Sequence, residues 1–133
     1  MKELQNPFGL HTITPYLIVE NVERLINFIR NVFDGELRGE ITYRSDKSIQ
    51  HAEIKIGDSV IMMGEPSPIV PEIKPMTCGM YLYVEHCDVV YEKAIKLGAH
   101  SISEPQDYPH GDRYAEIIDF AGNIWWIVTH IGK

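Results

Sequence analysis

The feature that most constrains this chain is an internal repeat. Ala52-Glu53-Ile54 recurs as Ala115-Glu116-Ile117, and in both copies a glycine turn and a run of large apolar residues follow. Val19-Glu20 matches Val84-Glu85 in the same order along the chain. An ordered series of matches favours duplication over the chance similarity of amphipathic segments. The 133 residues are therefore expected to fold as two similar halves.

Each half is predicted to be a βαβββ module. Residues 11–20 are rich in β-branched and aromatic residues, which is typical of a strand. Apolar residues then recur at helical spacing after Asn21, a suitable N-cap, and Gly35 is expected to supply the left-handed residue that ends the helix. Three short strands follow, and the second half repeats this order with Gly98 ending its helix.

The expected fold class is α+β, with two βαβββ modules forming curved mixed sheets around a concave pocket. We place the first module at residues 10–65, a Pro-rich linker at 66–77 and the second module at 78–131, all in one compact domain. Pro105 and Pro109 predict an irregular edge segment before the last hairpin, because proline cannot donate a ladder hydrogen bond.

Composition limits the partners and the compartment. The net charge of -7 argues against nucleic acid and anionic membranes as partners. The two cysteines, Cys78 and Cys87, lack a CxxC spacing, which favours a reducing compartment. We find no signal-peptide pattern at the start of the sequence and no apolar run of transmembrane length, so a cytoplasmic protein is expected.

The paired modules resemble the vicinal-oxygen-chelate superfamily, which includes glyoxalase I, extradiol dioxygenases, fosfomycin-resistance enzymes and bleomycin-binding proteins. The stretch GDRYAEIIDFAGNIWWIVTH (111–130) is similar to the closing pattern of that family, Asp-Pro-x-Gly followed by an aromatic-rich strand. GDR together with WWIVTH is most similar to a glyoxalase-like branch associated with phosphonate operons. Phe120 stands where the family usually has proline, yet residues 119–122 still suit a type I turn.

The resemblance implies a metal ligand, His or Glu, on the first and last strands of each module. Carried over to this sequence, those positions are Thr14, Met62, Met80 and Trp126. These side chains are poor metal ligands, so no cofactor is expected. We expect an apolar pocket in place of the usual metal site. The alternative is that these side chains fill the core and leave no pocket. Residues assigned to bind the ligand are Thr14, Tyr16, Met62, Met80, Leu82, Arg113, Tyr114 and Trp126.

Two groups of polar residues are candidates for chemistry. His51 and Glu53 lie two apart on a predicted strand and share a face, and the repeat places Tyr114 and Glu116 on the equivalent face of the second module. If these four residues line the concave pocket, they would bind a cation, hold a divalent metal at a non-standard position or act as acid and base. The alternative is that they lie on a solvent-exposed face of the sheet and have no functional role. Arg113 either forks onto a ligand anion or fixes the turn beside it.

Two functional hypotheses follow, with a third as a plainer alternative. The first is a binding protein for a small, partly aromatic organic molecule, and the acidic balance suits a cationic one. The second is a lyase, isomerase or dioxygenase-type enzyme that uses a non-standard metal or acid/base site around His51, Glu53 and Glu116. The third is a structural or regulatory dimer without a small-molecule site. The resemblance implies a homodimer in every case.

Overall fold

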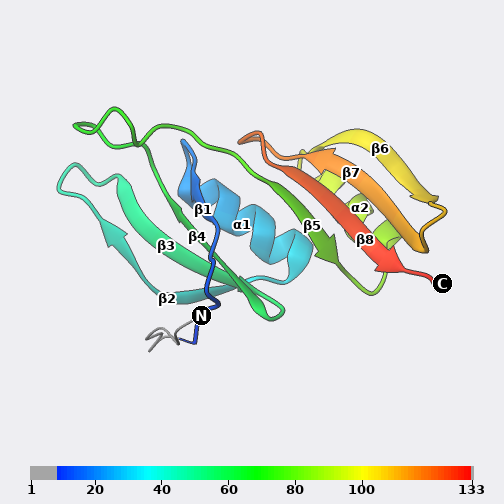
Figure 1. Cartoon of the computed structure of the whole chain (residues 1–133). Helices are drawn as coiled ribbons and strands as arrows, with labels where there is room; N and C mark the ends of the chain where they lie inside the picture. Colours follow the sequence, from blue (N-terminus) through cyan, green and yellow to red (C-terminus); the bar gives the residue numbers. More distant parts are fainter. Residues whose placement is uncertain (1–8, 133) are drawn as a thin grey trace.

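The computed structural model describes residues 9–132 and has the predicted α+β architecture of two βαβββ modules (Figure 1). The first module consists of β1 (Tyr16–Ile18), α1 (Val22–Phe33), β2 (Glu36–Tyr43), β3 (Ile49–Ile56) and β4 (Ser59–Gly64). The second consists of β5 (Gly79–Tyr83), α2 (Cys87–Lys96), β6 (His100–Asp107), β7 (Asp112–Ile118) and β8 (Ile124–His130).

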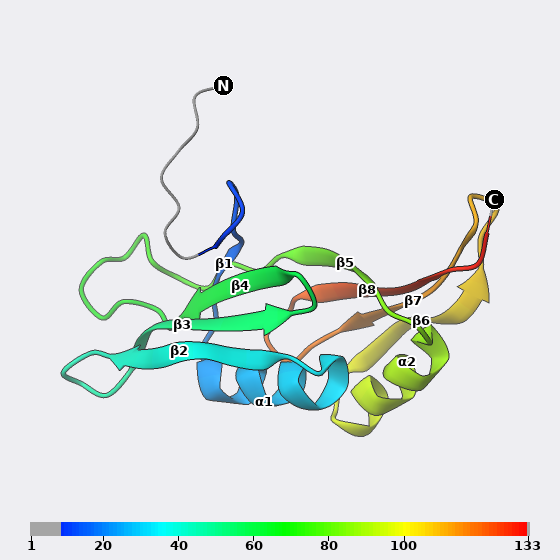
Figure 2. The same ribbon diagram turned by 90° about the horizontal axis from the view of Figure 1, so that it is seen from below.

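The two sheets have the same topology. The strand orders are β1-β4-β3-β2 and β5-β8-β7-β6, and in each sheet one outer pair is parallel and the other pairs are antiparallel. Both helices lie on the same side of the two sheets, which leaves the opposite face of each sheet uncovered (Figure 2). We call these uncovered faces the open faces. In one chain they lie side by side and do not face each other (Figure 1).

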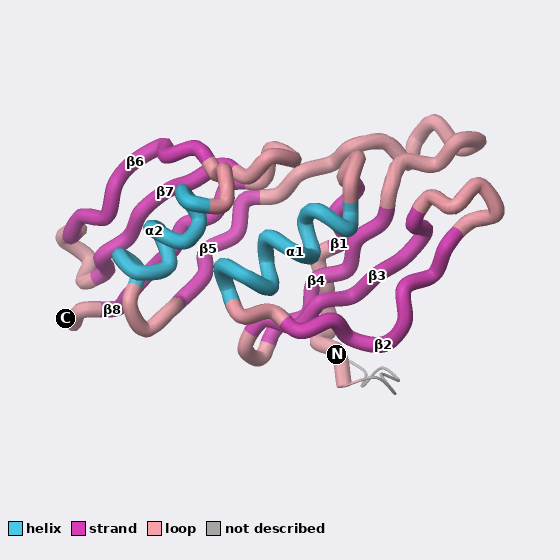
Figure 3. Tube along the Cα trace, turned by 180° about the vertical axis from the view of Figure 1, so that it is seen from behind, coloured by secondary structure: helices cyan, strands magenta, loops and turns pink. Residues whose placement is uncertain are grey.

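The hydrophobic core lies between the sheets and the helices and runs through both modules. Leu25 and Ile29 of α1 are buried against the sheet of the first module, whose Ile54 and Met63 are also fully buried. The helices pack against each other (Figure 3). Trp125 of the second sheet lies 4.5 Å from the ring of Phe33 at the end of α1. This shared core makes the two modules one folded unit.

The start of α1 agrees with the sequence and its end does not. Asn21 Oδ1 accepts a hydrogen bond from the backbone N–H of Arg24 at 3.0 Å, which confirms the cap. The left-handed residue at the C-terminus is Asp34, with φ of 54°, and not Gly35. Glycine is needed at position 35 for space, because a Cβ there would lie 2.6 Å from Cγ2 of Ile29.

One Pro-containing segment is more regular than predicted, whereas the linker at 66–77 contains no helix or strand. β6 is a strand that includes Pro105, and it occupies the edge of its sheet with shifts of register against β7. The edge position was predicted, but the irregular conformation was wrong. In the linker, Met76 exchanges backbone hydrogen bonds of 3.0 and 3.3 Å with Ile18. This pairing fixes the end of the linker beside β1.

Candidate functional site

The open faces carry the same row of residues in both modules. In the first sheet, Met62 of β4 lies between Tyr16 of β1 and Glu53 of β3. In the second sheet, Trp126 of β8 lies between Tyr81 of β5 and Glu116 of β7. The sequence analysis assigned Tyr16 to ligand binding but missed Tyr81 as its repeat partner. The available signal was that each tyrosine precedes its matched valine, Val19 or Val84, by three positions.

On the first sheet the row belongs to a chain of hydrogen bonds. The Tyr16 hydroxyl lies 2.9 Å from His51 Nδ1, and His51 Nε2 lies 2.8 Å from Glu53 Oε2. Arg38 Nη1 donates to Glu53 Oε1 at 2.9 Å. Burial raises the pKa of Tyr16, and the charge of Arg44 opposes that rise. The structure thus brings together three predicted residues: His51 and Glu53, which were candidates for chemistry, and Tyr16, which was assigned to ligand binding.

On the second sheet the open face is aromatic. The ring of Tyr81 is centred 5.6 Å from Tyr83, 6.0 Å from Tyr114 and 6.5 Å from Trp126. We call these four residues the aromatic face. Tyr81 is 46% exposed and Tyr83 is 62% exposed, although both are large and partly apolar. Tyr108 stacks on Tyr114 with centroids 3.9 Å apart and extends this surface.

A buried carboxylate supports the aromatic face. Asp112 is only 4% exposed, and its Oδ2 accepts a hydrogen bond of 2.7 Å from the Tyr81 hydroxyl. His130 Nδ1 lies 2.9 Å from the other oxygen, Oδ1. The hydrogen bonds from His130 and Tyr81 lower the pKa of Asp112, which keeps it ionised. Removal from water and the bond to Asp112 raise the pKa of Tyr81. Glu116, bonded to Ser103 at 2.9 Å, adds a second carboxyl group to this face.

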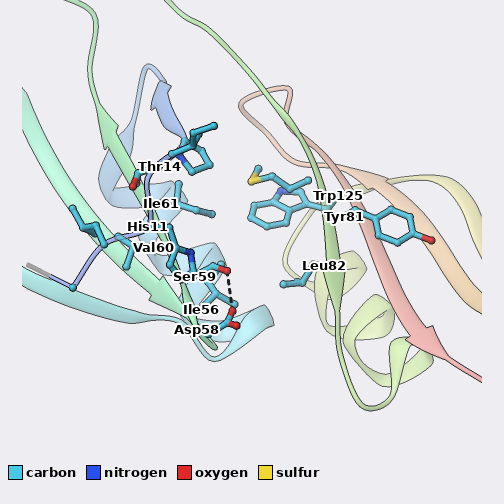
Figure 4. Close-up of a pocket in the computed structure, with 15 residues that line it drawn as sticks. His11, Thr14, Ile56, Asp58, Ser59, Val60, Ile61, Tyr81, Leu82 and Trp125 are labelled. Carbon is cyan, nitrogen blue, oxygen red and sulfur yellow. Dashed lines mark hydrogen bonds between the residues drawn. The ribbon is translucent and has the colours of Figure 1, made fainter. Parts of the chain in front are cut away.

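The residues assigned to one ligand pocket do not converge. Thr14, Met80 and Leu82 line a pocket of about 230 Å³ between the modules, together with Trp125 (Figure 4). Tyr81 is also among the residues that line that pocket, although its ring extends away from it (Figure 4). Met62 lies on the open face of the first sheet and Trp126, as the alternation of the strand predicts, lies on that of the second.

The positions carried over from the metal-binding relatives do not fit a metal ion. Met80 pairs with Trp125, so it was assigned to the wrong face, and the register makes Gly79 the repeat partner of Thr14. A threonine, a glycine, a methionine and a tryptophan provide no set of hard nitrogen or oxygen ligands. Within residues 9–132, no three His, Cys, Asp or Glu side chains are placed together as metal ligands.

Two further polar candidates have structural partners instead. Arg113 donates from Nε and Nη2 to the carboxylate of Asp88 at 2.8 Å each and from Nη1 to Asp107 at 3.0 Å, which ties β7 to α2. The hydrogen bonds from Arg113 lower the pKa of Asp88 to about 2. Arg113 therefore fixes local structure, the second of its two predicted roles. Glu116 lies on a different sheet from His51, so the predicted four-residue cluster does not form within one chain.

Comparisons with known proteins agree with this architecture. An uncharacterised protein of Mycobacterium bovis, Mb0911c, is 26% identical over 121 residues, which cover 85% of this chain and 79% of that protein. TioX from Micromonospora sp. ML1 has a similar structure, with a TM-score of 0.71 at 20% identity over 92% of this chain and 98% of that one.

Two further solved structures share the fold. A PhnB protein from Bacillus cereus gives a TM-score of 0.68 at 19% identity, covering 90% of this chain and 99% of that one. The fosfomycin resistance protein FosX from Mesorhizobium loti gives 0.63 at 18% identity, covering 92% of each chain. None of the described helices is long and apolar enough to span a membrane. The model of the Glyoxalase/Bleomycin resistance protein/Dioxygenase superfamily matches residues 9–127, and the chain belongs to that superfamily.

Proposed function

We propose that this protein binds a small cationic aromatic molecule on the aromatic face of its second sheet. The observation that supports the proposal is an exposed group of aromatic rings placed over a buried carboxylate, Asp112. Aromatic rings attract cations through their faces, and the attraction is worth about 0.5–2 kcal/mol for each contact. The flat part of such a ligand would stack on Trp126, whose ring lies in the same row as Glu116.

The charge of the surface selects a cation. Asp112 and Glu116 contribute acidic groups to this side of the sheet, whereas Arg113 on the same strand is bound to Asp88.

The pocket between the modules is a weaker candidate because its volume of about 230 Å³ is below the usual range for organic ligands. FosX, which has the same fold, is named for resistance to the small molecule fosfomycin.

The proposal includes a homodimer in the cytoplasm. A second copy would convert each open face into one wall of a closed cavity, which a single chain leaves uncovered. The two unpaired cysteines suit a reducing compartment. No metal is part of the proposed binding site, because its contacts are aromatic rings and carboxylates.

A pair of matched probes tests the proposal. Benzyltrimethylammonium carries a cation, and neopentylbenzene is its neutral analogue of nearly the same shape. Isothermal titration calorimetry of the dialysed protein should show the cationic probe binding at least about 10-fold more tightly than the neutral one. Equal affinity for the two probes, or no binding of the cation, would overturn the proposal.

Variants locate the site. Trp126→Leu should weaken binding of the cationic probe by about 10-fold, because it removes the largest ring of the aromatic face. Tyr43→Phe, an exposed position on the first sheet, is the control and should bind as the unmodified protein does. Unchanged affinity in Trp126→Leu would place the ligand elsewhere.

A further inference from the structure

We propose that Tyr16 and His51 form a metal-independent proton-transfer site on the first sheet, which removes a proton from a carbon next to a carbonyl group in a small apolar molecule. This activity is separate from cation binding on the second sheet. Tyr16 is the group that contacts the substrate, and His51 accepts the proton that the Tyr16 hydroxyl gives up. Glu53 acts through His51 as a positioning residue.

The hydrogen bonds around Tyr16 accommodate two proton arrangements. The Tyr16 oxygen lies 2.9 Å from His51 Nδ1 and 3.0 Å from the backbone oxygen of Gln50. With His51 neutral, its Nε2–H donates to Glu53 and the Tyr16 hydroxyl donates to Nδ1. With His51 protonated, both ring nitrogens donate, and the hydroxyl donates to Gln50 instead. The single hydroxyl proton of Tyr16 thus moves between two acceptors, His51 Nδ1 and the Gln50 oxygen, and His51 has a partner at both ring nitrogens in either arrangement.

Tyr16 also lines a cleft large enough for an organic substrate. The cleft has a volume of about 940 Å³ and lies between the start of the first sheet and the Pro-rich linker. Tyr16 is one of the residues that line the cleft, and it is 41% exposed. The apolar residues that line the cleft are Ile18, Ile69, Val70, Ile73 and Met76. The polar residues of the lining are Arg44, Ser45, Asp46, Gln50 and Ser67, so the cleft suits a ligand with an apolar body and a polar group.

Arg44 supplies a fixed positive charge at the same cleft. Its guanidinium donates to the backbone oxygens of Glu65 at 3.0 Å and Pro66 at 3.2 Å, and to Ser48 Oγ at 3.1 Å. Arg44 and Tyr16 line the same cleft, and the charge of Arg44 opposes the rise in the pKa of Tyr16 that burial causes. A cation beside a proton-accepting group is the arrangement that stabilises an enolate oxygen as the negative charge develops.

The repeat shows that this arrangement belongs to one module only. Glu53 and Glu116 are repeat partners, so the partner of His51, two positions earlier, is Tyr114. A phenol cannot replace imidazole as a proton acceptor at neutral pH. The first sheet thus carries the groups for proton transfer, whereas the second sheet carries aromatic rings at the same places.

The proposed step balances in protons and electrons. The Tyr16 oxygen takes the proton from the substrate carbon while the hydroxyl proton moves to His51 Nδ1. The electron pair of the broken C–H bond stays on the substrate as an enolate, whose oxygen faces Arg44. Glu53 stabilises the imidazolium that forms, as a carboxylate does in hydrolase triads. Reversal returns a proton to the same carbon or to another position of the enolate, without oxidant, reductant or metal.

Hydrogen–deuterium exchange tests the proposal directly. The probe is 4-phenylbutan-2-one in D₂O, and ¹H NMR follows the loss of its α-protons. The unmodified protein should accelerate exchange above buffer alone, and Tyr16→Phe should reduce the catalysed rate by about 100-fold or more. His51→Asn should reduce it similarly. Tyr43→Phe, on the same sheet and outside the cleft, should keep the full rate.

Two outcomes would overturn the proposal: no acceleration by the unmodified protein, or full activity in Tyr16→Phe. The role of Glu53 has its own readout. ¹⁵N NMR should show His51 with Nε2 protonated in the unmodified protein, and Glu53→Leu should mix the two tautomers. If His51 keeps the single tautomer in Glu53→Leu, Glu53 is not the residue that positions His51. Tyr16→Phe should still bind benzyltrimethylammonium, so the binding and proton-transfer proposals can fail separately.

Discussion

At the scale of single residues, Asp119 holds the turn between β7 and β8 together. It is buried, and its carboxylate accepts hydrogen bonds from Trp125 Nε1 at 2.8 Å and from Asn123 Nδ2 at 3.1 Å. It also accepts from the backbone N–H groups of Ala121 and Asn123. Asp119 thereby closes the turn that places Trp125 under α1 and Trp126 on the open face.

We expect Asp119→Ala to reduce the free energy of unfolding by about 3 kcal/mol, because several buried donors would lose their acceptor. Urea denaturation followed by tryptophan fluorescence measures this change. Asp58→Ala, an exposed position in the equivalent turn of the first module, is the control and should change stability by less than about 1 kcal/mol. Similar losses in the two variants would contradict the assigned role.

Asp112 makes stability depend on pH. Its pKa lies below the ordinary value of 3.8, because His130 and Tyr81 donate hydrogen bonds to the ionised form. A lowered pKa means that this contribution is present above the unfolded-state pKa and is lost as the pH falls through the folded-state value. The difference in stability between the unmodified protein and Asp112→Asn should therefore shrink as the pH falls below about pH 4. Chemical denaturation at each pH measures it; a constant difference down to about pH 3 would exclude this role.

At the scale of elements, the repeat provides each helix with a cap from the end of its own sheet. Glu65, directly after β4, accepts from the backbone N–H of Val22 at 3.0 Å, at the start of α1. Thr129 of β8 accepts from the backbone N–H of Cys87 at 2.8 Å, at the start of α2. These are equivalent positions of the two modules, although one side chain is a carboxylate and the other a hydroxyl.

Glu65→Ala should cost more stability than Thr129→Ala. Glu65 also accepts from the backbone N–H of Ile49 at 2.8 Å, and a charged acceptor at a helix N-terminus is stronger than a neutral one. We expect losses of about 2 and 1 kcal/mol respectively, measured by urea denaturation. Glu20→Ala, an exposed carboxylate two residues before α1, is the control and should have little effect. Equal losses for Glu65 and Thr129 would show that the charge is unimportant.

The elements were largely predictable from the sequence, whereas the face of β5 and the pairing partner of β1 were not. Alternation placed Trp125 and Trp126 correctly, because β8 is regular and its neighbours fix its register. Met80 was placed one residue out of register, since β5 lies between a linker and a loop and its sequence contains apolar residues on both faces. The contact of Tyr16 with His51 depends on β1 pairing with β4, and pairing between distant strands cannot be read from periodicity.

At the scale of the whole molecule, the two open faces are the surfaces that a single chain leaves incomplete. Figure 2 shows both helices on one side, and no helix or strand of residues 9–132 covers the other side of either sheet. The second sheet exposes Tyr81 and Tyr83 there, and an exposed apolar surface of this kind is typical of an interface or a binding site. Two copies that place open face against open face would cover this surface and enclose the ligand between them.

We therefore expect a dimer of about 30 kDa, twice the chain mass of 15.2 kDa, by size-exclusion chromatography with light scattering. Tyr83→Lys should shift the protein towards the monomer, because it places a charge in the covered surface. Val89→Lys on the outer side of α2, which is also exposed in one chain, is the matched control and should remain dimeric. A monomeric unmodified protein would mean that each open face works alone. If Val89→Lys is monomeric and Tyr83→Lys remains dimeric, the dimer interface lies on the helical side of the molecule and not on the open faces.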